Sequence, residues 1–389
     1  MANEALLNER LSLVREAVAM KSRPARIPQN SFYVTWKIFD SGYKLHEAMM
    51  NYDIMEKIVR EHQEVYGWDT QFEPGTRNAF RVTMPMGGGW YTIDDENDVV
   101  AFRDQAILEP EEFDEFMADQ QKFFWNKSMA RKYPQSWNEN TTLEQMQQVW
   151  DEFQGYIQYA GHIGQVMKDE YGLPPLQAPY GAYPAPDFMF NTIRGIKGFC
   201  VDLRKNLPKT LEVFAALDAV NYEPGMKMFE ALPDGPVPGF CFDFGITGFC
   251  HNFINMKQWD SIYWPYIKRM LDAVAKQHKN CCMFMEGESK RFWDYFKDYP
   301  KGTICMRPDK EDCFELRREC PDIAIMGGMP NVLLGTGTVQ ECLDLAKKCC
   351  DELGRDGGFI MSQDKLGSFR IDGKRENLKA VCDFVRDYR

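Results

Sequence analysis

A carboxylate at the end of an apolar segment is the first candidate for chemistry. Residues 281–286 read CCMFME, so five apolar residues are followed directly by Glu286. Burial disfavours the charged form of a carboxyl group, which suits a proton donor, a metal ligand or a substrate anchor. The structural alternative for Glu286 is an ion pair with Arg307 on the next predicted strand. We interpret Glu286 as a catalytic residue, with Gly287 leaving space for a ligand beside it.

Further polar residues follow predicted strands in the same way. Asp243 lies at the end of residues 239–244 and is a second candidate for acid–base chemistry, with a structural role as its alternative. Asp309 follows residues 303–307, and its first interpretation is a helix cap. The candidates for contacting a substrate are Trp36, Tyr180, Asp187, Arg307, Asp309 and Ser362.

One pair of adjacent residues, Cys250-His251, offers metal ligands. The five histidines form no His-x-x-x-His motif, and the cysteines form no Cys-x-x-Cys motif. His251 lies in the loop predicted to follow the Asp243 strand, which makes it a further catalytic candidate. Together with Cys250 and Glu286 it provides a ligand set for zinc. The alternative for Cys250 is a buried structural cysteine.

The elements that must position these residues are clearest in the C-terminal half. Five apolar segments alternate there with amphipathic helices: residues 239–244, 281–286, 303–307, 323–327 and 358–362. Near-continuous apolarity is typical of parallel strands that are covered on both faces. Thr338 and Glu341 have the spacing of a capping box at the start of one helix. No Gly-x-Gly-x-x-Gly or Walker motif is present, which favours a barrel over an open nucleotide-binding sheet.

Three less distinct strands complete the predicted fold, an α/β (β/α)8 TIM barrel. They are expected around residues 26–32, near 70–72 and leading into 178–184. We expect residues 1–25 to form an N-terminal helical extension and residues from 78 to about 168 to form helices inserted around the barrel. No linker divides the chain, which predicts a single domain over residues 1–389.

Composition restricts the partners and the compartment. Acidic residues outnumber basic ones by 58 to 46, and the resulting net charge of -12 argues against a nucleic-acid ligand. The 12 cysteines are scattered and the N-terminus has no secretory pattern, so we expect a reducing, cytoplasmic location. No apolar run approaches the ~18 residues that span a bilayer, which predicts a soluble protein.

The order of several segments resembles the uroporphyrinogen decarboxylase-like superfamily. The segments are RPARIP at 23–28, YWP at 263–265, FMEG at 284–287, GGMP at 327–330, LLGTGT at 333–338, DGGFI at 356–360 and ENLKA at 376–380. The resemblance implies a (β/α)8 barrel. It also implies one of two main activities, porphyrinogen decarboxylation or methyl exchange with a corrinoid protein.

The chain departs from both family patterns. The decarboxylases carry an N-terminal Arg-Gln-Ala-Gly-Arg segment, whereas residues 29–36 read QNSFYVTW, without the guanidinium groups that a polycarboxylate needs. The methyltransferases that form thioethers bind zinc through His-x-Cys and a later cysteine. This chain has MEG at 285–287 and MSQD at 361–364 instead. The usual zinc site therefore cannot be carried over, and Glu286 is expected to act as an acid, a ligand or an anchor.

The resemblance implies a methyltransferase of an anaerobic demethylation system. A methyl group would move between a small O-, S- or N-methylated substrate and the cobalamin of a separate corrinoid-binding protein. One alternative is a decarboxylase or other lyase of a small acid, with Arg307 or Arg194 anchoring a carboxylate. Another is a non-catalytic barrel that binds a corrinoid or tetrapyrrole. The sequence also leaves a homodimer open.

Overall fold

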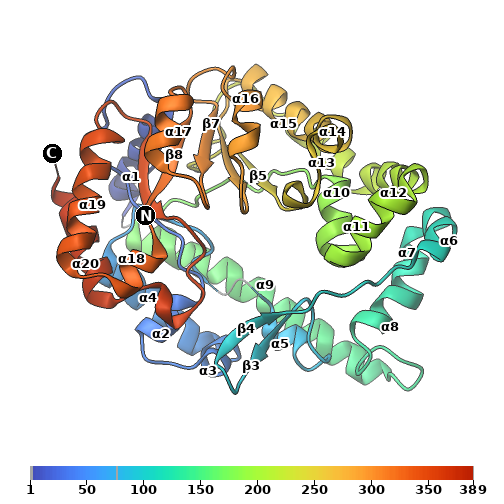
Figure 1. Cartoon of the computed structure of the whole chain (residues 1–389). Helices are drawn as coiled ribbons and strands as arrows, with labels where there is room; N and C mark the ends of the chain where they lie inside the picture. The colour runs from blue at the N-terminus through green and yellow to red at the C-terminus, as the bar shows by residue number, and fades with distance from the viewer. Residues whose placement is uncertain (1–2, 76–77, 389) are drawn as a thin grey trace.

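A five-stranded parallel sheet forms the centre of the molecule (Figure 1). The computed structural model describes residues 3–75 and 78–388. The strands follow the chain in the order β5 (Phe244–Gly248), β6 (Cys281–Met285), β7 (Ile304–Arg307), β8 (Ala324–Met329) and β9 (Phe359–Gln363). Most residues of these strands are buried, as expected for strands that are covered on both faces.

Short parallel segments continue the sheet into a ring of eight. Strand β1 (Asn30–Ser31) pairs with β2 (Thr70–Gln71), and Gln29 bridges to Met361 of β9. On the other side, isolated bridges join Gln71 to Pro175 and Gln177 to Phe242, which precedes β5. Since every pairing around this ring is parallel, the predicted (β/α)8 barrel is confirmed, and the three less distinct strands lie close to their predicted positions.

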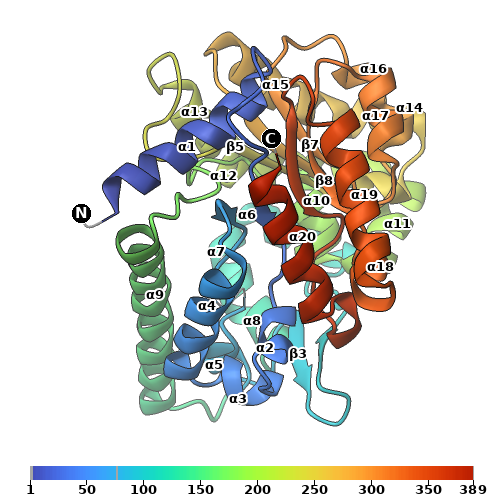
Figure 2. The same ribbon diagram turned by 90° about the vertical axis from the view of Figure 1, so that its left-hand side faces the viewer.

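Helix α1 (Glu4–Ala19) lies across the amino-terminal end of the barrel (Figure 2). Its side chains Val14, Ala17 and Val18 pack with inward-facing residues of the strands, including Cys282 and Cys305. The backbone N–H of Gly358, just before β9, donates to the carbonyl of Ala17 at 2.8 Å. A substrate must therefore approach from the opposite end, where the strands terminate.

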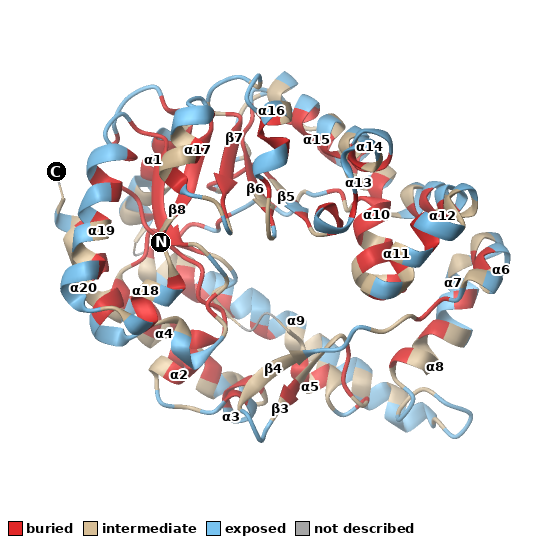
Figure 3. Cartoon of the chain, in the orientation of Figure 1, coloured by how far each residue is buried: buried red, intermediate tan, exposed pale blue. Residues whose placement is uncertain are grey.

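The remaining helices surround this ring, with buried inner faces and exposed outer faces (Figure 3). The helices before the insertion are α2 (Trp36–Asp40), α3 (Leu45–Met49) and α4 (Tyr52–Tyr66). Those of the C-terminal half are α10 (Ala185–Phe188), α11 (Gly195–Lys205), α12 (Leu207–Val220), α13 (Tyr222–Glu230), α14 (Met256–Gln258), α15 (Trp264–Lys276), α16 (Trp293–Phe296), α17 (Cys313–Glu319), α18 (Asn331–Thr336), α19 (Val339–Glu352) and α20 (Arg375–Asp387). Thr338 and Glu341 form the predicted capping box at α19.

The region from 78 to about 168 contains a hairpin as well as the predicted helices. Its elements are α5 (Phe80–Thr83), β3 (Tyr91–Asp94), β4 (Val99–Phe102), α6 (Phe113–Ala118), α7 (Gln120–Phe123), α8 (Met129–Lys132) and α9 (Leu143–Tyr171). Strands β3 and β4 pair antiparallel. This hairpin was not predicted from the sequence. None of the described helices is long and apolar enough to cross a membrane.

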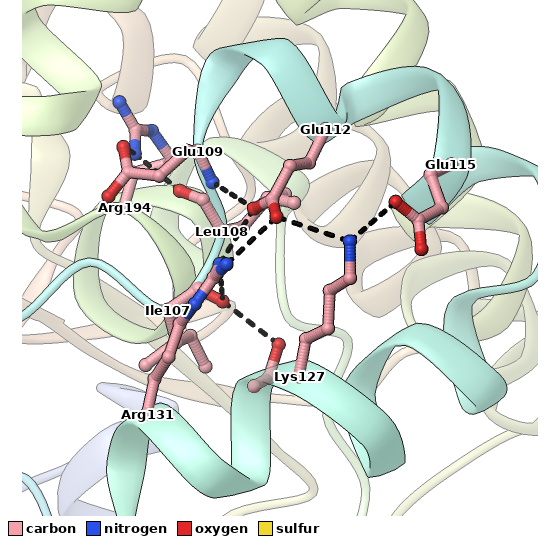
Figure 4. A network of polar contacts seen from close by, with 9 residues as sticks. Ile107, Leu108, Glu109, Glu112, Glu115, Lys127, Arg131 and Arg194 are labelled. Atoms are coloured by element: carbon pink, nitrogen blue, oxygen red, sulfur yellow. Dashed lines mark hydrogen bonds and ion pairs between the residues drawn. The ribbon is translucent and has the colours of Figure 1, made fainter.

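A polar network fastens the inserted helices to α11 (Figure 4). Arg131 donates to both carboxylate oxygens of Glu112, at 2.6 and 2.8 Å, and this pair lowers the pKa of Glu112 to about 2. Arg194 donates to Glu109 at 2.8 Å and to Asp202 at 2.7 Å. Because two carboxylates already neutralise Arg194, it is a structural cation and not an anchor for a ligand.

Candidate active site

A cavity of about 390 Å³ opens at the carboxyl ends of the barrel strands. Such a volume is within the range of small-molecule sites in proteins. Three of the phenylalanines that line it are in contact with one another, with Phe32 edge-on to Phe72 at 5.2 Å and to Phe284 at 5.6 Å between ring centroids. The charged residues in the lining are Glu73, Glu286 and Arg307.

Glu286 lies immediately after β6, at the rim of this cavity. Its backbone N–H donates to the carbonyl of Gly248 at 3.0 Å, which extends the pairing of β6 with β5 by one residue. The Asn252 amide donates to the carbonyl of Glu286. These bonds fix the backbone from which the carboxylate projects.

Position 287 requires a glycine because of its backbone conformation and because a neighbouring side chain lies close to it. Its φ is +90°, and a Cβ at this position would lie 2.6 Å from Nδ2 of Asn252. The backbone N–H of Gly287 donates to Oδ2 of Asp309 at 2.7 Å. The absence of a side chain at Gly287 therefore leaves space for the Asn252 side chain, whereas the sequence predicted space for a ligand.

Arg307 points into the barrel from the end of β7 and is almost fully buried, with 3% of its surface exposed. Its Nη1 lies 2.8 Å from Sδ of Met326, and its Nη2 lies 3.4 Å from Oγ of Ser362. The guanidinium carbon is 3.4 Å from the centroid of the Phe32 ring. Burial lowers the pKa of Arg307 to about 10, so it stays protonated at neutral pH.

Asp309 and Ser362 support neighbouring groups at the cavity. Asp309 holds the Gly287 backbone, and the helix cap that was expected of it is provided by Asp312, whose carboxylate accepts from the first turn of α17. Ser362 is buried and accepts hydrogen bonds from Asn30 at 3.0 Å and from Arg307. Both residues therefore lie near the predicted site.

The prediction that Asp243 faces the mouth of the barrel is wrong. The strand begins at Phe244, so Asp243 lies at its amino-terminal end. Its buried carboxylate accepts from Arg15 of α1 at 2.9 Å, from the N–H of Val237 at 2.7 Å and from the N–H of Asn280 at 2.9 Å. Asp243 joins α1 to the closed end of the barrel and cannot reach Glu286.

Asp187 organises the loop after β5. Its Oδ1 accepts from the N–H of Phe249 at 3.0 Å and of Cys250 at 2.8 Å, and its Oδ2 accepts from the Tyr263 hydroxyl at 2.5 Å. The carboxylate is fully buried, and burial raises its pKa despite these bonds. With both oxygens engaged by the protein, Asp187 acts as a structural acceptor and not as the expected substrate contact.

His251 is also a buried residue and is not in the cavity lining. It lies in a short 3-10 turn, residues 250–253, and its ring meets that of Phe292 edge-on at 5.7 Å. Burial, with a further contribution from the Arg291 charge, lowers the pKa of His251 to about 3. Neither ring nitrogen makes a hydrogen bond to a described residue within the usual geometric limits, although the neighbouring Glu286 backbone opposes part of this decrease in pKa. The ring is neutral at physiological pH and lies behind the cavity wall.

The residues predicted to bind zinc do not fit one metal ion. Cys250 is buried beside Asp187, and burial raises its thiol pKa well above the ordinary value, which disfavours a thiolate ligand. His251 packs on Phe292, whereas Glu286 lies at the rim. Within residues 3–75 and 78–388, no three His, Cys, Asp or Glu side chains gather as metal ligands.

Trp36 and Tyr180 lie outside the cavity lining. The indole N–H of Trp36 donates to the carbonyl of Gly373 at 3.0 Å, and the side chain is buried in α2. The Tyr180 ring packs near Phe229, with 6.3 Å between centroids. Sequence reasoning missed the three phenylalanines, although Phe32, Phe72 and Phe284 alternate with outward-facing residues near the ends of their strands, which is a usable signal.

Comparison with known proteins matches the C-terminal part of the chain to one family model. Residues 241–388 match the family model described as Uroporphyrinogen decarboxylase (URO-D). Among solved structures, the whole fold is similar to a methyltransferase from Methanosarcina mazei, with a TM-score of 0.61 and 10% sequence identity. The alignment covers 97% of this chain and 98% of that chain. No curated relative matches the sequence.

Proposed function

We propose that the chain is a methyltransferase of the uroporphyrinogen decarboxylase-like superfamily, whose family model matches residues 241–388. It moves a methyl group from a small O-, S- or N-methylated substrate to a corrinoid carried by a separate protein. The observation that carries this proposal is Glu286, a carboxylate at the rim of an aromatic cavity at the carboxyl end of the barrel.

The residues of the cavity provide positioning and a proton. Phe32, Phe72 and Phe284 surround the methylated end of the substrate and exclude water from it. When the carbon–heteroatom bond breaks, its electron pair stays on the heteroatom, and Glu286 donates a proton to that atom. The corrinoid supplies the nucleophilic cobalt that accepts the methyl group.

Methyl transfer to cob(I)alamin tests this proposal. Purified protein is incubated without oxygen with cob(I)alamin and a series of methoxy, methylthio and methylamino compounds. We expect at least one donor to convert the reduced cofactor to its methylated form, followed by its absorption spectrum. If no donor supports conversion of either free or protein-bound cob(I)alamin, the proposal is rejected.

Arg307 favours a second candidate function, decarboxylation of a small acid. Its buried guanidinium lines the cavity and is suited to a carboxylate. A decarboxylase would release carbon dioxide from the acid in the absence of any corrinoid. Labelled carbon dioxide measured under those conditions separates the two functions, because methyl transfer leaves the carboxylate intact.

A further inference from the structure

Arg307 is a buried cation for which the described residues provide no anion. The contacts of its guanidinium are a methionine sulfur, a long hydrogen bond to Ser362 and the face of the Phe32 ring. Sulfur is a weak acceptor, and the Nε of Arg307 has no partner. None of the ion pairs of the described residues includes Arg307. Burial of an unpaired cation has a desolvation penalty that no ion pair offsets.

The other buried arginine, Arg194, is neutralised by carboxylates of the protein. Arg194, with 5% of its surface exposed, is paired with Asp202 and Glu109. Arg307 is more deeply buried, with 3% exposed, yet it faces the cavity. The missing counterion of Arg307 therefore belongs in the cavity, where a ligand can supply it.

Ser362 provides a hydroxyl group beside Arg307. Asn30 donates through Nδ2 to Oγ of Ser362 at 3.0 Å. Ser362 accepts from both Asn30 and Arg307, so its own hydroxyl hydrogen can be directed to a further acceptor. An anion in front of Arg307 would thus receive hydrogen bonds from the guanidinium and from this serine.

We propose that the cavity takes a small methylated monocarboxylate, whose carboxylate pairs with Arg307 while its methylated end lies toward Glu286. A carboxylate fits better than a phosphate because Arg307 is the single cation among the described lining residues, beside the acids Glu73 and Glu286. A dianion would meet net negative charge there. The assignment of the methyl group rests on the proposed function, whereas the assignment of the carboxylate does not.

The strand register limits the length of this substrate. Phe284 pairs with Arg307 across β6 and β7, and Glu286 follows two residues later. With a rise of about 3.3 Å per residue, Glu286 lies roughly 7 Å farther along the strand direction than Arg307. Both residues line the same cavity. The methylated heteroatom is therefore only a few bonds from the carboxylate carbon.

The first test compares the stability of two variants of the ligand-free protein. Arg307→Met removes an unpaired buried charge, so we expect the urea midpoint to stay the same or rise. Arg194→Met leaves Asp202 buried without its cation and should lower the midpoint clearly. If Arg307→Met lowers the midpoint as much as Arg194→Met, Arg307 is a structural cation and the proposal is overturned.

The second test measures binding by calorimetry, without any corrinoid. The probes are methoxyacetate, methylthioacetate and trimethylglycine, each compared with its amide, and inorganic phosphate serves as a different anion. We expect at least one acid to bind at least tenfold more tightly than its amide and than phosphate. Arg307→Met should weaken that acid at least tenfold and leave the amide unchanged, since a buried charge partner is lost.

Three results of the binding test would overturn the proposal. They are equal binding of acids and amides, preference for phosphate over every acid (or no binding of any acid), and unchanged binding of the acid by Arg307→Met. If an acid binds through Arg307 but no methyl reaches cob(I)alamin, the carboxylate site stands and the proposed methyltransferase activity falls.

Discussion

Replacing His251 with leucine should remove a strong acid sensitivity of the fold. An imidazole in the unfolded chain takes up a proton near its ordinary pKa of 6.5, whereas burial holds the pKa of the folded His251 at about 3. The folded state therefore favours the neutral ring. This contribution to stability is fully present above pH 6.5 and is lost as the pH falls toward 3.

The size of the effect follows from the pKa difference. At a pH about two units below 6.5, the loss is about two times 1.4 kcal/mol, or about 3 kcal/mol. The assay is urea unfolding of the wild type and His251→Leu at about pH 7.5 and at about pH 4.5. Both proteins lose stability from their carboxylates, but the wild type should lose about 3 kcal/mol more than the variant.

Two results would refute this reasoning about His251. One is the same pH dependence of stability in wild type and variant. The other is a His251 resonance that titrates near pH 6.5 in the folded protein, since a buried neutral ring cannot do so. Loss of methyl transfer in a folded His251→Leu protein would further contradict a location behind the cavity wall.

Two further substitutions test the rim and the closed end of the barrel. Gly287→Ala should lower the free energy of unfolding by about 1–2 kcal/mol because of the positive φ at this position. It should also reduce methyl transfer by displacing Glu286. The matched control is Gly235→Ala, which should keep activity because Gly235 also has a positive φ, +85°, and no atom lies within 4 Å of the added Cβ. Equal activity of the two glycine variants would contradict this. Arg15→Met should lower the free energy of unfolding by about 3 kcal/mol, measured with urea, by leaving Asp243 buried without its cation. An unchanged urea midpoint would show that the pair contributes nothing.

The barrel could be predicted because several of its strands are short segments of apolar residues. Residues 281–285 and 323–327 are apolar throughout, and the structure places β6 and β8 there. Even the very short β1 and β2 lie within or beside their expected positions. The hairpin of β3 and β4 was missed because the strands have only four residues each and lie in a region rich in helical signals.

The error at Asp243 shows where composition fails. Residues 239–244 read GFCFDF and form the most apolar run of that region, but the strand itself is FGITG at residues 244–248, with two glycines and a threonine. Pairing with β6 selects this segment, and such long-range pairing cannot be read from one strand alone. A shift of a few residues moved Asp243 from the open end of the barrel to the closed end.

The unpaired state of Arg307 could not be predicted for a related reason. The sequence offered Glu286 as its partner on the neighbouring strand. In the structure the guanidinium instead contacts Met326 and Ser362, and none of the ion pairs of the described residues includes it. Which side chains meet inside a barrel depends on the register of all its strands.

The most direct measurement for the central claim compares Glu286→Gln with Glu288→Gln in methyl transfer to cob(I)alamin. Glu288 lies two residues away, pairs with Arg291 and does not line the cavity. If Glu286 gives its proton to the departing heteroatom, Glu286→Gln should lower the rate by about 10²-fold or more, and Glu288→Gln should keep the wild-type rate. Equal rates for the two variants would contradict a catalytic role for Glu286.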